Sequence, residues 1–441
     1  MDSPRFRNLA FYVGGACASL QAIDFFSQKY GWPSWLFHHA LLLAISGLLI
    51  LLFRWLFDRV RGNRAVGMLE LLLMVCSVGL VWGLGIWYSP VSPDARQVQA
   101  PGNPKVQEAL LRARYLLNLS DSPSGIDSAI QALQICLQLA PEEALAHAML
   151  SQAYTHKLFY VDPSVTWGEK SFIEAQRAFS LDSTLAYAFF ARGYANWTPL
   201  HKFPHELTMM DYMRSIALDP SFDESYNQLG LVLSHVGIHK PAISMYDKAF
   251  AMNPTNDIAA SNKVRALFFN QQHQEVVESF RHMPPNLYNI SYRLSQHAMS
   301  LLHIGQLDKA KEIVEKVLSQ SPEDQPMQAV NAVRLALLRQ NKEALKSIET
   351  VAAGRKVQRG HYHHVAYDIA TAYALLGDKT HAMEWLIWAS DNGFPCYSAY
   401  SQDQFLNNLR DMPEFKQLLT ECQAQSDRLL NVFMFSDGMS K

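Results

Sequence analysis

The sequence of 441 residues predicts an all-α protein, in which two to three transmembrane helices precede an α-solenoid of about seven to eight helix pairs. Three observations predict this arrangement. The N-terminal part contains long apolar segments with few charges, and beyond it a pattern of small and aromatic residues recurs about every 34 residues. Alternating runs of β-branched residues bounded by turn residues, which are typical of strands, are nearly absent.

The window Tyr226–Pro254 shows the recurring pattern most clearly. Gly230 and Ala242 are small, which lets two antiparallel helices cross closely, while Leu229 and Tyr246 fill the groove between them. The final proline ends the second helix because it lacks the backbone N–H for an intrahelical bond. These residues stand at the offsets of a tetratricopeptide repeat, a helix–turn–helix unit of about 34 residues. Stacked units of this kind form a scaffold, and scaffolds usually bind partners rather than catalyse reactions.

The pattern and the composition together divide the chain into five predicted parts. They are a transmembrane module (1–88), a proline-rich linker (89–104), the repeat solenoid (105–392), C-terminal capping helices (393–430) and a flexible tail (431–441). Five cysteines without CxxC spacing indicate free buried thiols rather than a disulfide framework.

Three segments of the first part are candidates for spanning the membrane, at about residues 9–26, 35–57 and 66–88. The second and third are long and almost free of charge, with tryptophans near their ends, where aromatic rings prefer the membrane interface. The first carries Asp24 in its last turns, so it either spans the bilayer or lies in the interface.

The arginines of the chain predict its orientation. Four of them crowd the short link between the second and third segments: Arg54, Arg59, Arg61 and Arg64. Short links rich in Arg and Lys stay in the cytoplasm, so the repeats that follow Tyr88 are expected on the opposite side of the membrane.

Two stretches of sequence carry a family resemblance. They are Gly31-Trp32-Pro33-Ser34-Trp35 near the N-terminus and Gly393-Phe394-Pro395-Cys396-Tyr397 near the C-terminus. Both stretches and the residues around them resemble bacterial membrane-anchored tetratricopeptide repeat proteins with an N-terminal multi-helix transmembrane module. The resemblance implies a multi-pass protein of the inner membrane with a periplasmic repeat domain. Members of that group often carry a cyclase, kinase or DNA-binding domain; none precedes the helices here, so their activities are not implied.

A partner-binding groove is predicted on the concave side of the solenoid. First helices of such repeats face that side, so positions 2, 5, 9 and 12 of each first helix are the candidates. In the two best units the candidate residues are Tyr187, Phe190, Tyr194, Trp197, Glu224, Asn227 and Leu231. Aromatic residues are frequent anchors in interfaces, although repeats also bury aromatics between neighbouring units.

Few residues suggest chemistry. His205-Glu206 begins like the HExxH zinc motif, but Met209 occupies the second ligand position, so a solvated helix start is expected there. His361, His363 and His364 form a dense cluster that is either a histidine-rich helix start or a transition-metal site. Nucleophile elbows and phosphate-binding loops are absent from the sequence, so no catalytic residue, cofactor or metal site is predicted and the chain is not expected to be an enzyme.

Two functions remain open at this stage. The chain is a membrane-anchored scaffold that binds a protein or peptide, or it is a sensor subunit that relays an envelope signal to a cytoplasmic partner. The expected partners are a protein or peptide ligand and the lipid bilayer. Nucleic acid is not expected, because the net charge is −2.

Overall fold

A computed structural model describes residues 103–118, 123–254, 257–283, 290–357 and 360–438. The predicted transmembrane module and nearly all of the predicted linker lie outside the described residues. Within the described part of the chain, no helix combines the length and the apolar character needed to cross a bilayer.

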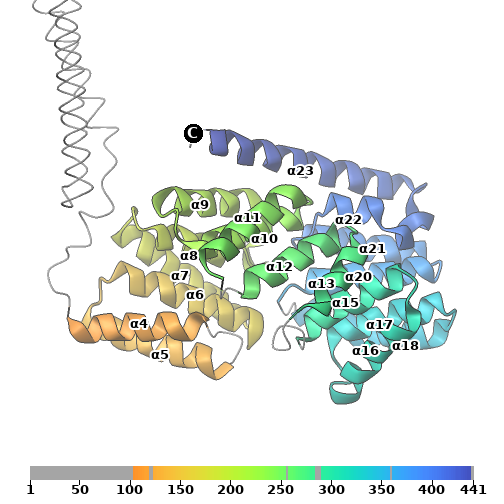
Figure 1. Ribbon diagram of the computed structural model, residues 1–441, viewed down its shortest axis with the longest axis horizontal. Coiled ribbons are helices and arrows are strands. Elements are labelled where there is room, and N and C mark those ends of the chain that lie inside the picture. The colour runs from red at the N-terminus through yellow and green to blue at the C-terminus, as the bar shows by residue number, and fades with distance from the viewer. Residues whose placement is uncertain (1–102, 119–122, 255–256, 284–289, 358–359, 439–441) are drawn as a thin grey trace, which may run out of the picture. The chain divides into compact units, whose positions relative to one another are not determined.

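The described residues form eight pairs of adjacent helices (Figure 1), which confirms the predicted all-α repeat fold. The pairs are α4 (Pro104–Asn118) with α5 (Pro123–Leu139), α6 (Ala144–Tyr160) with α7 (Val165–Leu181), α8 (Ala186–Asn196) with α9 (His205–Leu218), α10 (Asp223–His235) with α11 (His239–Met252), α12 (Asp257–Phe269) with α13 (His273–Arg281), α15 (Ser291–His303) with α16 (Leu307–Gln320), α17 (Gln325–Leu337) with α18 (Asn341–Ala352), and α20 (Tyr362–Leu375) with α21 (Lys379–Asp391). Short elements connect or follow them: η2 (Pro199–His201), α19 (Gly354–Val357), α22 (Tyr397–Gln402) and η3 (Gln404–Leu409).

Close helix crossing inside a pair depends on glycine, as the sequence predicts. A Cβ atom placed on Gly230 would lie 2.8 Å from the ring of Tyr246 in the partner helix. In the preceding pair, a Cβ on Gly193 would lie 3.0 Å from the ring of Tyr212. Both tyrosine rings are fully buried, so each fills the space that a side chain on the glycine would need.

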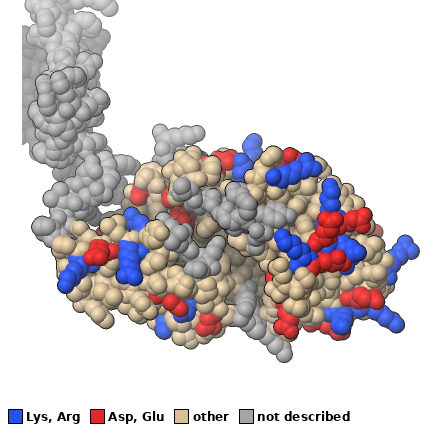
Figure 2. All heavy atoms as spheres, turned by 60° about the horizontal axis from the view of Figure 1, so that its bottom comes forward, with Lys and Arg blue, Asp and Glu red and all other residues tan. Residues whose placement is uncertain are grey.

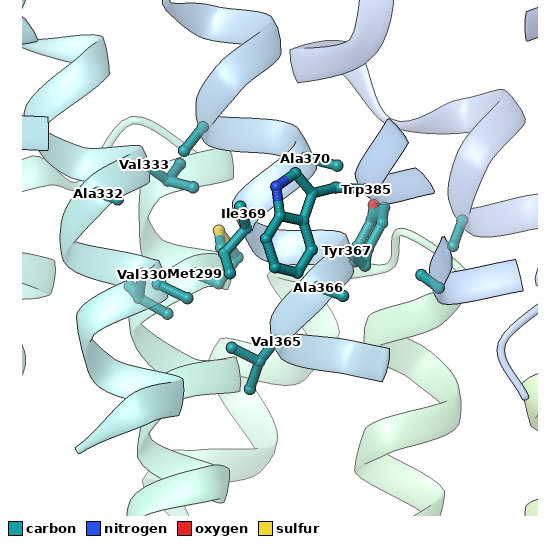
Figure 3. Packing of buried hydrophobic residues seen from close by; sticks show 14 of the residues in the cluster. Met299, Val330, Ala332, Val333, Val365, Ala366, Tyr367, Ile369, Ala370 and Trp385 are labelled. Carbon is teal, nitrogen blue, oxygen red and sulfur yellow. The ribbon is translucent and has the colours of Figure 1, made fainter. Parts of the chain in front are cut away.

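Successive pairs bury their apolar faces against one another in clusters that span neighbouring pairs. Figure 3 shows one of these clusters in the second half of the solenoid, where Met299 (α15), Val330 and Val333 (α17), Ile369 (α20) and Trp385 (α21) gather. Each such aliphatic side chain contributes about 1.5–3 kcal/mol when it leaves water. The core therefore depends on stacking, because a single pair could not bury these faces alone.

The last helix, α23 (Pro413–Gly438), runs back over the solenoid toward α9 (Figure 1). Leu429 and Phe433 are buried in the apolar cluster of α8–α11, and Arg428 pairs with Glu206 at 3.3 Å. This corrects the predicted boundary between the capping helices and a flexible tail at residue 431. The helix continues to residue 438 because Phe433 has apolar surface to bury against the first half of the repeats.

A second contact between distant parts of the chain lies beneath α23. The loop after α21 places Gly393 against Phe203 in the loop after α8, so closely that a Cβ on Gly393 would lie 2.5 Å from the ring. His205 Nε2 donates to the Gly393 carbonyl at 3.2 Å, although the two residues are 188 positions apart. Further along, His239 and Ser398 share a hydrogen bond. We call this contact between residues 203–239 and 393–398 the interlock; it joins the third and fourth pairs to the C-terminal segment.

The substitution Gly230→Ala is expected to destabilise the fold by about 1–2 kcal/mol, because overpacking at Tyr246 exceeds the gain in helix propensity. Urea unfolding followed by circular dichroism measures the change. Gly168→Ala is the matched control, since its Cβ would lie 3.3 Å from Leu200 Cδ2 and 3.5 Å from Leu158 Cδ2, the ends of two flexible side chains that can move away. Equal stabilities for the two variants would contradict the packing role of Gly230.

The substitution Gly393→Ala tests the interlock. Gly393 has a φ of +107°, and its new Cβ would also clash with Phe203, so a loss of about 2 kcal/mol or more is expected. Gly305→Ala is the control for backbone strain alone, because Gly305 has a φ of +76° and no atom within 4 Å of its Cβ position. The variant at Gly393 should lose more stability in thermal unfolding than the control. In a Phe203→Ala background, which is itself destabilised, Gly393→Ala should cost less than it does in the parent. A loss no greater than that of the control would argue against the interlock.

Candidate functional site: the inner cavity

A cavity of about 930 Å³ lies inside the solenoid. All of its lining residues come from the first helices of the pairs or from the loops that lead into them, as the repeat pattern predicts for a concave surface. They are Phe159, Tyr160, Tyr194, Gln228, Leu231, Ile258, Asn262, Arg265, Ile290, Tyr292, Arg293, Glu323, Asp324, Gln325, Pro326, Gly360, His361, Tyr362 and Val365. Helices from both halves of the chain therefore share one cavity.

One wall of the cavity is aromatic. Phe159, from the end of α6, stacks on His361 at the start of α20 with ring centroids 5.1 Å apart. Phe159 also stacks on Tyr194 of α8, with ring centroids 6.2 Å apart. Flat, rigid rings of this kind offer large contact area to a ligand at a small cost in conformational entropy.

Polar groups point into the cavity from α10 and α12. Asn262 Nδ2 donates to Asn227 Oδ1 at 3.0 Å, which orients both amides. The side-chain oxygen Oε1 of Gln228 and the Nε of Arg265 are buried and have no hydrogen-bond partner among the described residues. Unsatisfied buried polar atoms cost about 1–3 kcal/mol each, so they are natural contact points for a ligand.

Arg265 contributes a positive charge to the wall of the cavity. Its guanidinium carbon lies 5.0 Å from the centre of the Tyr292 ring, within the range of a cation–π contact. Burial raises the pKa of Tyr292, so its hydroxyl stays protonated, and it bonds to Nδ1 of His364. The result is a positively charged, half-buried group beside neutral aromatic surface.

Some of the predicted groove residues line the cavity, whereas others are fully buried. Tyr194 and Leu231 line the cavity, and Asn227 touches it through its bond to Asn262. Phe190 and Trp197 have no exposed surface, so their predicted place on a groove wall is wrong in this conformation. Phe190 packs against Tyr212 and Phe222, at the contact between adjacent repeats. Trp197 packs against His235 of the next pair and His361 of the eighth.

Tyr187 and Glu224 lie away from the cavity. The Tyr187 hydroxyl bonds to Gln152, and its ring stacks on Phe222 at 4.9 Å. Burial, together with the nearby charge of Asp223, raises the pKa of Glu224 to about 7. These two residues therefore belong to the contact between adjacent repeats.

The central residues Asn262 and Arg265 were missed by sequence reasoning. Their repeat, between residues 257 and 285, keeps few of the pattern residues of the other units. No groove residue was therefore predicted on its first helix. The signal was nevertheless present: Arg265 stands 34 residues after Leu231, and Asn262 stands 35 after Asn227. Carrying the repeat period through a degenerate unit would have found them.

Of the histidines singled out in the sequence, His205, His363 and His364 are buried and His361 is half-buried. The predicted solvated helix start at His205 is wrong, because its ring lies in the interlock, where burial lowers its pKa to about 4. Burial likewise lowers the pKa of His361 to about 3, and the pKa values of His363 and His364 fall well below the usual range. All four rings are therefore neutral at neutral pH.

The three described cysteines are free and buried, as predicted. Burial raises the pKa of the Cys136 and Cys396 thiols to about 11 and that of Cys422 to about 12. Thiols that remain protonated and covered are poor nucleophiles.

Charges on the surface are mixed. On the face shown in Figure 2, lysines and arginines alternate with acidic side chains over the described residues. A nucleic-acid surface needs a continuous basic stripe, which this face lacks among the residues described.

No protein-family model and no curated protein matches the chain. Solved structures do match. A tetratricopeptide repeat protein from Parabacteroides merdae is 16% identical and covers 65% of this chain and 99% of its own, with a TM-score of 0.39. YrrB, titled a TPR protein with an unusual peptide-binding site, is 16% identical over 58% of this chain and 97% of its own, with a TM-score of 0.23. Human IFIT1, solved as a dimer with m7Gppp-AAAA, is 13% identical over 80% of this chain and 89% of its own, with a TM-score of 0.45.

At these identities and TM-scores the likenesses carry no argument about function. The class of the protein follows from its own helix pairs and residue offsets: the described part of the chain is an α-solenoid scaffold of the tetratricopeptide type.

Proposed function

We propose that the chain is a membrane-anchored scaffold whose inner cavity binds an extended segment of a partner protein. The observation that carries this proposal is the buried Nε of Arg265, which has no partner among the described residues and lies inside a cavity lined by first helices. Because Arg265 is positive, the bound segment carries a carboxylate close to it. The Asn262 amide can bond to the peptide backbone, and the aromatic wall at Phe159 and Tyr194 can cover an apolar side chain.

The size of the cavity supports a short segment rather than a whole domain. Its volume of about 930 Å³ is at the upper end of the range of about 300–1,000 Å³ that small ligands occupy. A few residues of a peptide fit such a space.

The proposal includes an anchor and a location. The apolar segments before residue 88 would hold the scaffold in the inner membrane, with the lipid bilayer as a second partner. The arginine-rich link between them would stay in the cytoplasm, which would put the repeats in the periplasm. This part of the proposal rests on the sequence.

A photo-crosslinking residue at position 258 is expected to capture the partner in cells, because Ile258 lines the cavity and is partly exposed. The matched control is position 173 on α7, where Ile173 is exposed on a second helix. Crosslinked products resolved by mass should appear at position 258 only. Capture at position 173 alone would place the partner on the outer surface and overturn the cavity proposal.

The substitution Arg265→Ala is expected to weaken partner binding roughly tenfold or more, since a charged hydrogen bond contributes about 1.5–3 kcal/mol. Arg281→Ala is the control, because Arg281 is exposed on α13, where it pairs with Glu278 at 2.6 Å on the same helix. Crosslinking yield at position 258 in each background measures the effect. An unchanged yield with Arg265→Ala would show that the carboxylate of the partner does not bind there.

A fusion of alkaline phosphatase after Leu117 is expected to be active, because this enzyme works only outside the cytoplasm. A fluorescent protein that requires the cytoplasm, fused at the same residue, should remain dark. The opposite pair of results would reverse the proposed orientation while leaving the cavity proposal intact.

A further inference from the structure

Four histidine rings meet beside the cavity, where the end of α10 faces the start of α20. His235 is the last residue of α10, and His361, His363 and His364 surround the first turn of α20. The ring centroids of His235, His361 and His363 form a nearly equilateral triangle, with sides of 5.4, 5.3 and 5.3 Å. His364 lies 4.4 Å from His363 and 4.8 Å from His235.

Nitrogens of these rings are buried without partners. Nε2 of His235, Nδ1 of His361 and Nε2 of His363 have no hydrogen-bond partner within the described part of the chain. One ring nitrogen from each of the three lies within 4.8 Å of the other two. Leaving so many nitrogens unsatisfied in one place costs about 1–3 kcal/mol for each, unless another group binds them all.

We propose that His235, His361 and His363 together bind one divalent first-row transition-metal ion of the zinc class. Imidazole nitrogen is a preferred ligand of these ions. Nitrogens about 2.0–2.1 Å from a tetrahedral zinc lie roughly 3.3 Å apart, so small ring rotations bring the three nitrogens into place. His364 Nε2, which is also buried and without a partner among the described residues, is the fourth candidate ligand.

The ring of His235 is already oriented for this task. His235 Nδ1 donates to the Leu231 carbonyl at 2.7 Å, which leaves the lone pair on Nε2. The backbone of Asn392 lies close enough to the His363 ring to raise its pKa, against the larger effect of burial. Metal-binding histidines characteristically hold their second nitrogen on a carbonyl or carboxylate, which fixes the tautomer and the ring direction.

Some features of the cluster favour binding of a metal cation and one opposes it. A histidine binds a metal ion through a neutral ring with a free nitrogen lone pair, and each of the three rings has a buried nitrogen that lacks a partner among the described residues. The nearby positive charge of the Arg265 guanidinium opposes an added cation. An anion in the cavity, such as the carboxylate proposed above, would offset that charge, but the metal site does not require it.

The site has a route to solvent and a structural consequence. His361 is half-buried and lines the cavity, so an ion can enter from there. Because His235 belongs to the fourth pair and the other ligands to the eighth, the ion would bind the two halves of the solenoid together. It would act next to the interlock, since Phe203 lies edge-on to His363 at 5.1 Å.

Titration of the full chain with Co²⁺ tests the site, using protein purified through an affinity tag that contains no histidine. The expected result is one tightly bound ion per chain, with the visible absorption of tetrahedral cobalt that Zn²⁺ then displaces. Zn²⁺ should also raise the melting temperature, because it binds the folded state. His361→Phe keeps a ring to stack on Phe159 but removes the ligand, and it should weaken Co²⁺ binding roughly tenfold or more and abolish the thermal shift.

The control variant is His282→Ala, whose side chain is 80% exposed and distant in sequence from the cluster. It should bind Co²⁺ as the parent does. Unchanged circular dichroism of His361→Phe confirms that it folds; if it does not, His363→Phe replaces it. Absence of a tightly bound ion in the parent, or equal binding by parent and His361→Phe, would overturn the proposal and leave buried water as the partner of these nitrogens. None of these outcomes depends on whether a peptide binds in the cavity.

Discussion

The return of the C-terminal segment onto the third and fourth helix pairs is the contact on which the rest of the structure depends. Repeats that contact only their neighbours make an open superhelix with a broad, solvent-filled concave face. Here the Gly393 loop and α23 reach back across the chain to the first half of the repeats, and helices from both halves line one cavity. The absence of a side chain at Gly393 allows Phe203 to approach it, so one small residue controls how tightly the two halves meet.

Burial also explains the chemistry around the cavity. Residues from α6, α8, α10, α12, α15, α17 and α20 line one space, and burial favours the neutral forms of the histidine and tyrosine side chains there. Histidines become neutral there and Tyr292 keeps its proton, while Arg265 remains charged because a guanidinium is almost impossible to deprotonate. Most residues that line the cavity are uncharged, and the charged ones are Arg265, Arg293, Glu323 and Asp324.

Helix pairs and their internal packing could be predicted well from the sequence. Tyr246 and Gly230 are close in the chain, so their contact follows from repeat geometry alone, and the structure places them together. The candidate site could be predicted only in part. Tyr194 and Leu231 do line the cavity, but Phe190 and Trp197 are buried. A side chain that points to the concave side can either face the cavity or pack against other helices. Which of the two occurs depends on the angle between pairs, and no local pattern encodes that angle.

Local periodicity by itself determined the all-α class, the repeat unit and the glycines at helix crossings, because these depend on residues fewer than about 34 positions apart. Only the tertiary structure decided that His235 meets His361, that His205 bonds to Gly393, and that α23 continues past residue 431 to bury Phe433. These contacts join residues more than a hundred positions apart. Their formation depends on the summed twist of many repeats, which becomes visible only when the whole solenoid is folded.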